Sequence, residues 1–123
     1  MLKVNFLHIC ENAIVEQGSG NLSIIGIFEN INAQSFPAMH PTMSVVVGFE
    51  NNNPGIYDTE LIFLDEKEEI LKIQAKITIG SNLKGNWIYK IVGYQIPREM
   101  TQKIKLNYEG KTICSGYLTI NNK

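Results

Sequence analysis

Two histidines and two cysteines are the side chains of this sequence best suited to bind a metal or to attack a substrate. His8 and Cys10 are two residues apart, so a strand would present both on one face and could offer two ligands to zinc. A structural zinc site needs four ligands, and the neighbouring sequence does not supply the other two. We therefore interpret His8 as a packed or hydrogen-bonded histidine, and the sequence predicts no metal and no cofactor.

The sequence offers little support for nucleophilic catalysis. His40 lies between Met39 and Pro41, which favours a loop residue over a catalytic base, and no G-x-S-x-G motif is present. We predict that Cys10 and Cys114, on the first and last strands, are buried free thiols. A disulfide between them is the alternative, whereas a reactive thiolate would need a positive environment. We accordingly predict no catalytic residues and no enzymatic activity.

Acidic residues gather between two predicted strands, at Asp65, Glu66, Glu68 and Glu69. Calcium takes several oxygen ligands, and acidic loops of C2-type sandwich domains can provide them. Lys67 interrupts this cluster, and no second acidic loop is evident. The cluster therefore favours a solvated hairpin turn.

Four lysines lie on two predicted strands, Lys72 and Lys76 on one and Lys103 and Lys105 on the other. With Trp87 or Tyr89 between them they could form a nucleic-acid surface. The whole chain has 11 basic and 12 acidic residues, so it lacks the positive field that attracts nucleic acids and anionic membranes. We expect neither partner, and because no signal peptide or apolar run of about 20 residues is present we expect a cytoplasmic protein.

The elements that would position these side chains are β-strands, because apolar and polar residues alternate along much of the chain. Residues 71–79 show the cleanest alternation, and residues 42–50 also place every second side chain on an apolar face. In residues 2–10 the same period assigns four side chains to the core face: Leu2, Val4, Phe6 and Cys10. These segments predict strands with one face in a core.

About eight such strands, separated by turn signals and without a convincing amphipathic helix, predict an all-β fold. Residues 36–41 contain two prolines, which cannot donate ladder hydrogen bonds, and we interpret this segment as a crossover. At 123 residues the chain is expected to be one domain, residues 1–123. We predict a single antiparallel β-sandwich with immunoglobulin-like or C2-like topology; a jelly roll or flattened barrel is the alternative.

Two segments carry more apolar side chains than one core face can use. Residues 22–31 have isoleucines on both faces, and residues 86–96 have aromatic or aliphatic residues on both. The surplus side chains define a candidate partner surface: Ile25, Ile27, Ile31, Trp87, Tyr89 and Ile91. Loops such as residues 32–41 could cover them within the monomer, or another chain could do so.

The opening strand with Cys10, the segment NLSIIGIFENI at residues 21–31, and the segment SFPAMHP at residues 35–41 before a valine-rich strand resemble a known family. It is a family of small uncharacterised bacterial and phage proteins of unknown function. The likeness is strongest over residues 1–50. It implies a compact β-rich domain and brings no catalytic residues with it.

These observations favour a non-enzymatic binding or assembly module that acts through a protein partner or as a homodimer. The alternative is a small-ligand carrier or enzyme with a pocket lined by Trp87, Tyr89, Tyr94 and His40. A ligand that raises the melting temperature would favour the carrier, and a dimer in solution would favour the assembly module.

Overall fold

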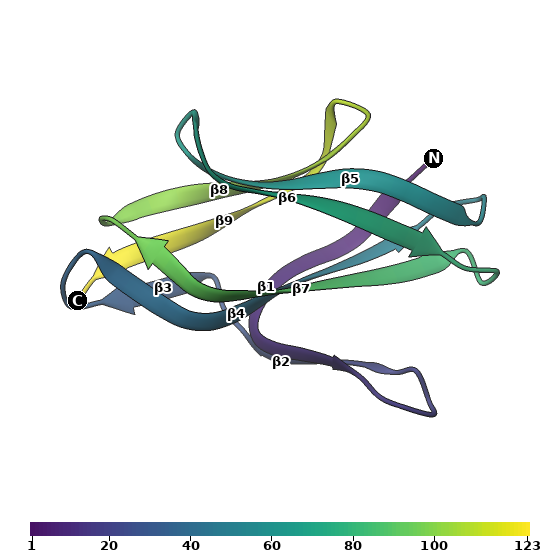
Figure 1. The fold of residues 1–123 in the computed structure, drawn as a ribbon, viewed down its shortest axis with the longest axis horizontal. Coiled ribbons are helices and arrows are strands. Elements are labelled where there is room, and N and C mark those ends of the chain that lie inside the picture. Colours follow the sequence, from purple (N-terminus) through teal and green to yellow (C-terminus); the bar gives the residue numbers. More distant parts are fainter.

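The computed structural model describes residues 1–123, and all of its regular secondary structure is β (Figure 1). This confirms the predicted all-β class, although there are nine strands rather than about eight. The strands are β1 (Lys3–Val15), β2 (Leu22–Ile27), β3 (Asn30–Ala33), β4 (Ala38–Glu50), β5 (Gly55–Asp65), β6 (Glu68–Ile79), β7 (Lys84–Ile96), β8 (Met100–Tyr108) and β9 (Lys111–Asn122).

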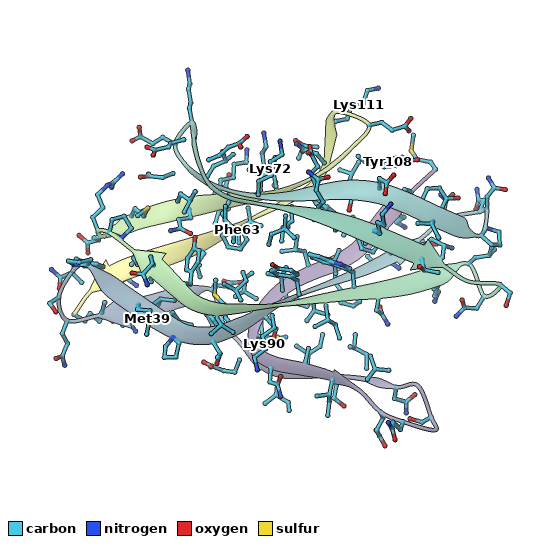
Figure 2. All side chains as sticks on the ribbon, viewed as in Figure 1. Met39, Phe63, Lys72, Lys90, Tyr108 and Lys111 are labelled. Atoms are coloured by element: carbon cyan, nitrogen blue, oxygen red, sulfur yellow. The ribbon has the colours of Figure 1, made fainter.

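The strands form two sheets that lie one above the other (Figure 1). Sheet A has the order β2-β1-β4-β7, and sheet B has the order β3-β9-β8-β5-β6. Their facing side chains form one core, with Phe63 between the sheets and Lys72 pointing away from them (Figure 2). The core faces predicted for residues 42–50 and 71–79 are confirmed, since Val45 and Ile77 are at most 1% exposed.

The predicted strand at residues 22–31 is two strands, which explains why it has two apolar faces. β2 pairs with β1 in sheet A, and after Phe28 and Glu29 the chain enters sheet B as β3. β3 runs parallel to β9, with Ile31 opposite Ile120. The prediction of a purely antiparallel sandwich was therefore wrong, because a chain that changes sheets without reversing can meet the last strand in the same direction.

A shift in the pairing of β1 with β4 changes which side chains of β1 face the core. The register shifts between Val4 and Phe6, so Asn5 is an extra residue of the kind found at a β-bulge. Leu7 and Ile9 then pack with the core. Phe6 and Cys10 turn to the opposite face of sheet A, so their predicted position on the core face was wrong.

The segment predicted as a crossover is partly a strand, because β4 already begins at Ala38 and contains Pro41. β4 pairs with β7 along its length, but its pairing with β1 ends at Ser44. Pro41 therefore lies beyond that pairing, where its missing N–H breaks no hydrogen bond to β1. The prediction failed because an edge position tolerates the proline that an interior position does not.

β7 changes its inward face at Gly93. Val92 is 71% exposed and Tyr94 is 5% exposed, although residues two apart in a regular strand share a face. Gly93 between them has a φ of 68°, a conformation that glycine adopts at low cost. The alternation of residues 86–96 therefore does not continue through Gly93.

Candidate interaction surface

β1 belongs to two different structures along its length. Residues 3–10 pair with β4 inside sheet A, and residues 10–15 pair only with β2. We call residues 10–27 the β1–β2 ribbon. It leaves the body of the two sheets on the side of sheet A, at the bottom of the view (Figure 1). Only Cys10 has a ladder partner on both sides, Ile27 and Ser44.

The ribbon closes on itself through its turn. The Glu16 amide donates to the Asn21 carbonyl over 2.8 Å, and the Gly20 amide donates to the Glu16 carbonyl over 2.9 Å. Gly18 and Gly20 have positive φ values, which the tight return of the chain requires. The ribbon is thus a complete hairpin whose two outer edges, one along β2 and one along residues 11–15 of β1, have no strand partner.

The apolar side chains of the ribbon take no part in the core between the sheets. None belongs to the core cluster or packs against it. Four are large and exposed: Ile14 46%, Val15 55%, Ile25 53% and Ile27 53%. Ile14 and Ile25 share a face, since Ile14 is opposite Ser23 and Asn12 is opposite Ile25. Ile27, at the base, also lines a cavity of about 80 Å³ with Leu7 and Tyr117.

The thiol at the base of the ribbon is a packed group. Cys10 is fully buried, and its Sγ lies 3.3 Å from the Asn12 carbonyl oxygen and 3.6 Å from that of Ser44. Burial raises the pKa of the Cys10 thiol, as it does for the half-buried Cys114. Both cysteines are free. A raised pKa leaves little thiolate near neutral pH, which is the opposite of the shift that activates a cysteine nucleophile.

The predicted partner surface is divided by the structure. Ile25 and Ile27 are on the ribbon, whereas Ile31 and Ile91 are 7% and 8% exposed and lie in the core. The remaining two residues, Trp87 and Tyr89, stack with ring centroids 5.6 Å apart on β7. β7 and β2 are opposite ends of sheet A, so these aromatics do not join the isoleucines.

The predicted partner surface leaves out Ile14 and Val15, which the structure places on the same ribbon as Ile25. The apolar triplet at residues 13–15 and the apolar run at residues 22–25 flank a turn with two glycines. That arrangement is a hairpin signal, and it indicates that the strand with Ile14 and Val15 pairs with the strand that contains Ile25.

The alternative pocket is also not assembled. The Tyr94 hydroxyl donates to Gln102 Oε1 over 2.5 Å in the core, and burial raises the pKa of Tyr94 to about 12. His40 packs against Phe28 with ring centroids 5.4 Å apart, and its buried Nε2 has no hydrogen-bond partner. Tyr94 also lines a groove of about 260 Å³ between β6 and β7, but Trp87, Tyr89 and His40 do not line it.

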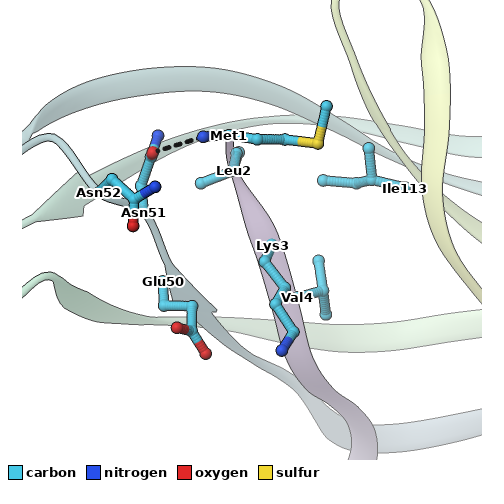
Figure 3. Close-up of a pocket in the computed structure, with 8 residues that line it drawn as sticks. All are labelled: Met1, Leu2, Lys3, Val4, Glu50, Asn51, Asn52 and Ile113. Carbon is cyan, nitrogen blue, oxygen red and sulfur yellow. Dashed lines mark hydrogen bonds between the residues drawn. The ribbon is translucent and has the colours of Figure 1, made fainter.

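Larger hollows lie where β1 begins. One of about 460 Å³ is lined by Leu2, Val4 and Ile113, with the amino group of Met1 donating to Asn51 Oδ1 over 3.1 Å (Figure 3). A second, of about 570 Å³, adjoins it and reaches two tyrosines, Tyr57 and Tyr108, that pack edge to face. No three His, Cys, Asp or Glu side chains in the chain are placed to hold a metal ion.

Comparisons with known proteins give a family and a fold. The chain belongs to a family of unknown function, DUF6941, whose model matches residues 5–121. This confirms the resemblance to a family of unknown function. No curated protein matches the sequence. None of the chain's secondary structure is a helix of membrane-spanning length.

A solved structure with a similar fold is that of the Pseudomonas fluorescens alkylpurine DNA glycosylase AlkC, bound to DNA containing an abasic site analog. The two share 8% sequence identity with a TM-score of 0.56. The match covers 98% of this chain but only 30% of the solved chain. At this identity the likeness shows the fold alone.

Proposed function

We propose that this member of the DUF6941 family is a non-enzymatic binding or assembly module that acts in the cytoplasm through another protein chain. Its contact surface is the β1–β2 ribbon. We further propose that the two sheets form an immunoglobulin-like sandwich, in which the ribbon is an addition to the body.

One observation carries this proposal: a two-stranded ribbon with exposed isoleucines on a strand edge that has no partner. A two-stranded hairpin alone is marginally stable in water. An apolar edge strand is also a template for pairing with another chain. Since the core does not use these side chains, a second chain is the simplest reason for them.

The composition of the ribbon edge supports a protein partner over a nucleic acid or a membrane. β2 has the sequence LSIIGI, without a charged residue. The charged residues of the ribbon are Glu11 and Glu16, which phosphates and anionic lipids would repel.

The test is capture of proteins from the native cell by the tagged wild-type chain and by two variants. Ile25→Glu places a charge on the ribbon face, and Val92→Glu places one on a β-branched residue of β7 that is still more exposed, 71% against 53%. We expect a protein that is retained by wild type and by Val92→Glu and is lost with Ile25→Glu. The same difference must then appear between purified proteins. Equal capture by all three chains would contradict the proposal.

A further inference from the structure

Charge is unevenly distributed along this chain, and the ribbon lies in its acidic part. Between Lys3 and Lys67 there is no lysine or arginine. The ribbon therefore has only acidic charges, at Glu11 and Glu16, and Glu29 follows it. Its surface combines exposed isoleucines with negative charge, so a matching partner surface should combine apolar groups with positive charge.

The outer face of sheet B has this composition. Lys72 and Lys105 lie on either side of Ile62, with which both are in register. Ile62 is 5% exposed although it faces away from the core, because long lysine side chains can cover an apolar neighbour. We call this surface, which also includes Lys103 beside Leu64, the lysine face.

Two of the lysines on this face have no acidic partner. Lys72 pairs with Glu60 over 3.3 Å, and Lys76 pairs with Asp58 over 3.0 Å. Lys103 and Lys105 form no ion pair. Tyr117, opposite Lys103 in the ladder, is 60% exposed. The centre of the face over β8 and β9 is therefore positive, with an exposed aromatic ring beside it.

The ribbon and the lysine face point in opposite directions. The ribbon leaves the molecule on the side of sheet A, and Lys72 points outward from sheet B (Figure 2). One chain therefore cannot join its own two surfaces. Their lengths also match, since the six residues of β2 span roughly 20 Å and fit within the nine residues of β8, roughly 30 Å.

We propose that copies of this chain associate head to tail, with the β1–β2 ribbon of one copy seated on the lysine face of the next. This inference rests on the proposed function and names the partner of the ribbon as a second copy. Ile14 and Ile25 pack on the alkyl stems of the lysines that cover Ile62, and Glu16, which continues the ribbon face of Ile14, approaches Lys103 and Lys105. A contact between two different surfaces of one chain leaves one of each free, so it continues into a ring or a filament.

Two variants test this arrangement through measured mass. The ribbon variant is Ile25→Glu, and the face variant is Lys103→Glu with Lys105→Glu. We expect the wild-type mass by sedimentation velocity to rise with concentration beyond that of a dimer. Each variant alone should associate about tenfold or more weakly, because a charge enters an apolar contact or meets a like charge.

Mixing the two variants is the decisive measurement. The intact ribbon of the face variant should dock on the intact face of the ribbon variant and give a 1:1 dimer that does not grow. A face variant that still dimerises alone would show a ribbon-to-ribbon contact and overturn the head-to-tail arrangement. A ribbon variant that still dimerises alone would overturn it equally.

Control variants distinguish a lost contact between copies from a chain that does not fold and from binding of a different ligand. Val92→Glu should assemble as wild type does, and each variant should keep its cooperative thermal unfolding. If the face variant does not fold, Lys103→Gln with Lys105→Gln replaces it. A wild-type chain that stays monomeric would overturn this inference while leaving ribbon-dependent capture of a different protein, and so the proposed function, intact. Retention of single-stranded DNA by a monomeric wild type, lost in the face variant, would overturn it in favour of a nucleic acid.

Discussion

β6 and β2 are both the last strands of their sheets, yet they are built in different ways. β6 alternates buried residues such as Ile73 and Ile77 with exposed polar ones such as Lys72 and Lys76. β2 has no charged residue, and Ile25 and Ile27 are each 53% exposed. Charged side chains on an edge strand oppose pairing with other chains.

Within this one domain, the edge strand β6 carries charged residues that oppose pairing with another chain, and the edge strand β2 carries none. The polar face of β6 is exposed to solvent on the outside of sheet B, and its inner face packs in the core. β2 contributes nothing to that core, and Ile25 and Ile27 on it are exposed in the monomer. Mutations on the two strands should therefore affect different properties.

The largest expected effect comes from deleting a buried side chain of β6. Ile77→Ala should lower the free energy of unfolding by about 2–5 kcal/mol, because it removes apolar burial and leaves a cavity. Ile25→Ala on β2 should cost well under about 1 kcal/mol. Urea unfolding at low protein concentration measures both. Equal losses would contradict the separation of the ribbon from the core.

The second-largest expected effect on stability comes from removing the buried hydroxyl of Tyr94, a polar group of the core. Tyr94→Phe removes the donor to Gln102, which is fully buried, and should cost about 1–3 kcal/mol. Because the pKa of Tyr94 is raised to about 12 in the folded chain, stability should be complete below the unfolded pKa of about 10. It should then fall between about pH 10 and pH 12. The slope of stability against pH in that window should be shallower in Tyr94→Phe.

A third test changes the ribbon edge into an edge like that of β6. Ile25→Lys should alter the free energy of unfolding by less than about 0.5 kcal/mol, since this exposed side chain is outside the core. Its effect should appear in the concentration dependence of the mass. Lys76→Ile makes the reverse change on β6 and should increase association or aggregation. If the Ile25→Lys chain associates as strongly as wild type does, the proposed difference between the β2 and β6 edges is wrong.

The smallest expected effect is on the surface ion pairs of sheet B. The side chains of Lys76 and Asp58 are each 77% exposed, so Lys76→Ala should change stability by less than about 0.5 kcal/mol. Thermal unfolding at low and high salt measures this difference. A change as large as that of Ile77→Ala would mean that the polar face of β6 has a structural role.

The sequence correctly predicted the strands in which apolar and polar residues alternate without interruption. The alternation in residues 71–79 gave the correct inner face of β6, because nothing interrupts its period. It failed where one residue changes the geometry: Asn5 shifts the register of β1, and Gly93 reverses the face of β7. Neither the bulge nor the positive φ has a signature in the period of the apolar residues.

The candidate surface was predicted in part for a related reason. Ile25 and Ile27 were recognised as surplus apolar residues, and both are exposed. Ile31 was grouped with them because residues 22–31 read as one strand, and a change of sheet at Phe28 leaves no mark in the alternation. Long-range pairing decides which isoleucines meet the core, and the local pattern does not contain it.

Cys10 is the one residue with ladder partners on both sides where the ribbon leaves sheet A. The Phe28 amide also donates to the Ile9 carbonyl over 2.9 Å, so the base of the ribbon is held on a residue that pairs with β4. The backbone angles at this junction set the direction in which the ribbon projects from the body. In a head-to-tail assembly that same direction would set how sharply each copy turns relative to the one before it.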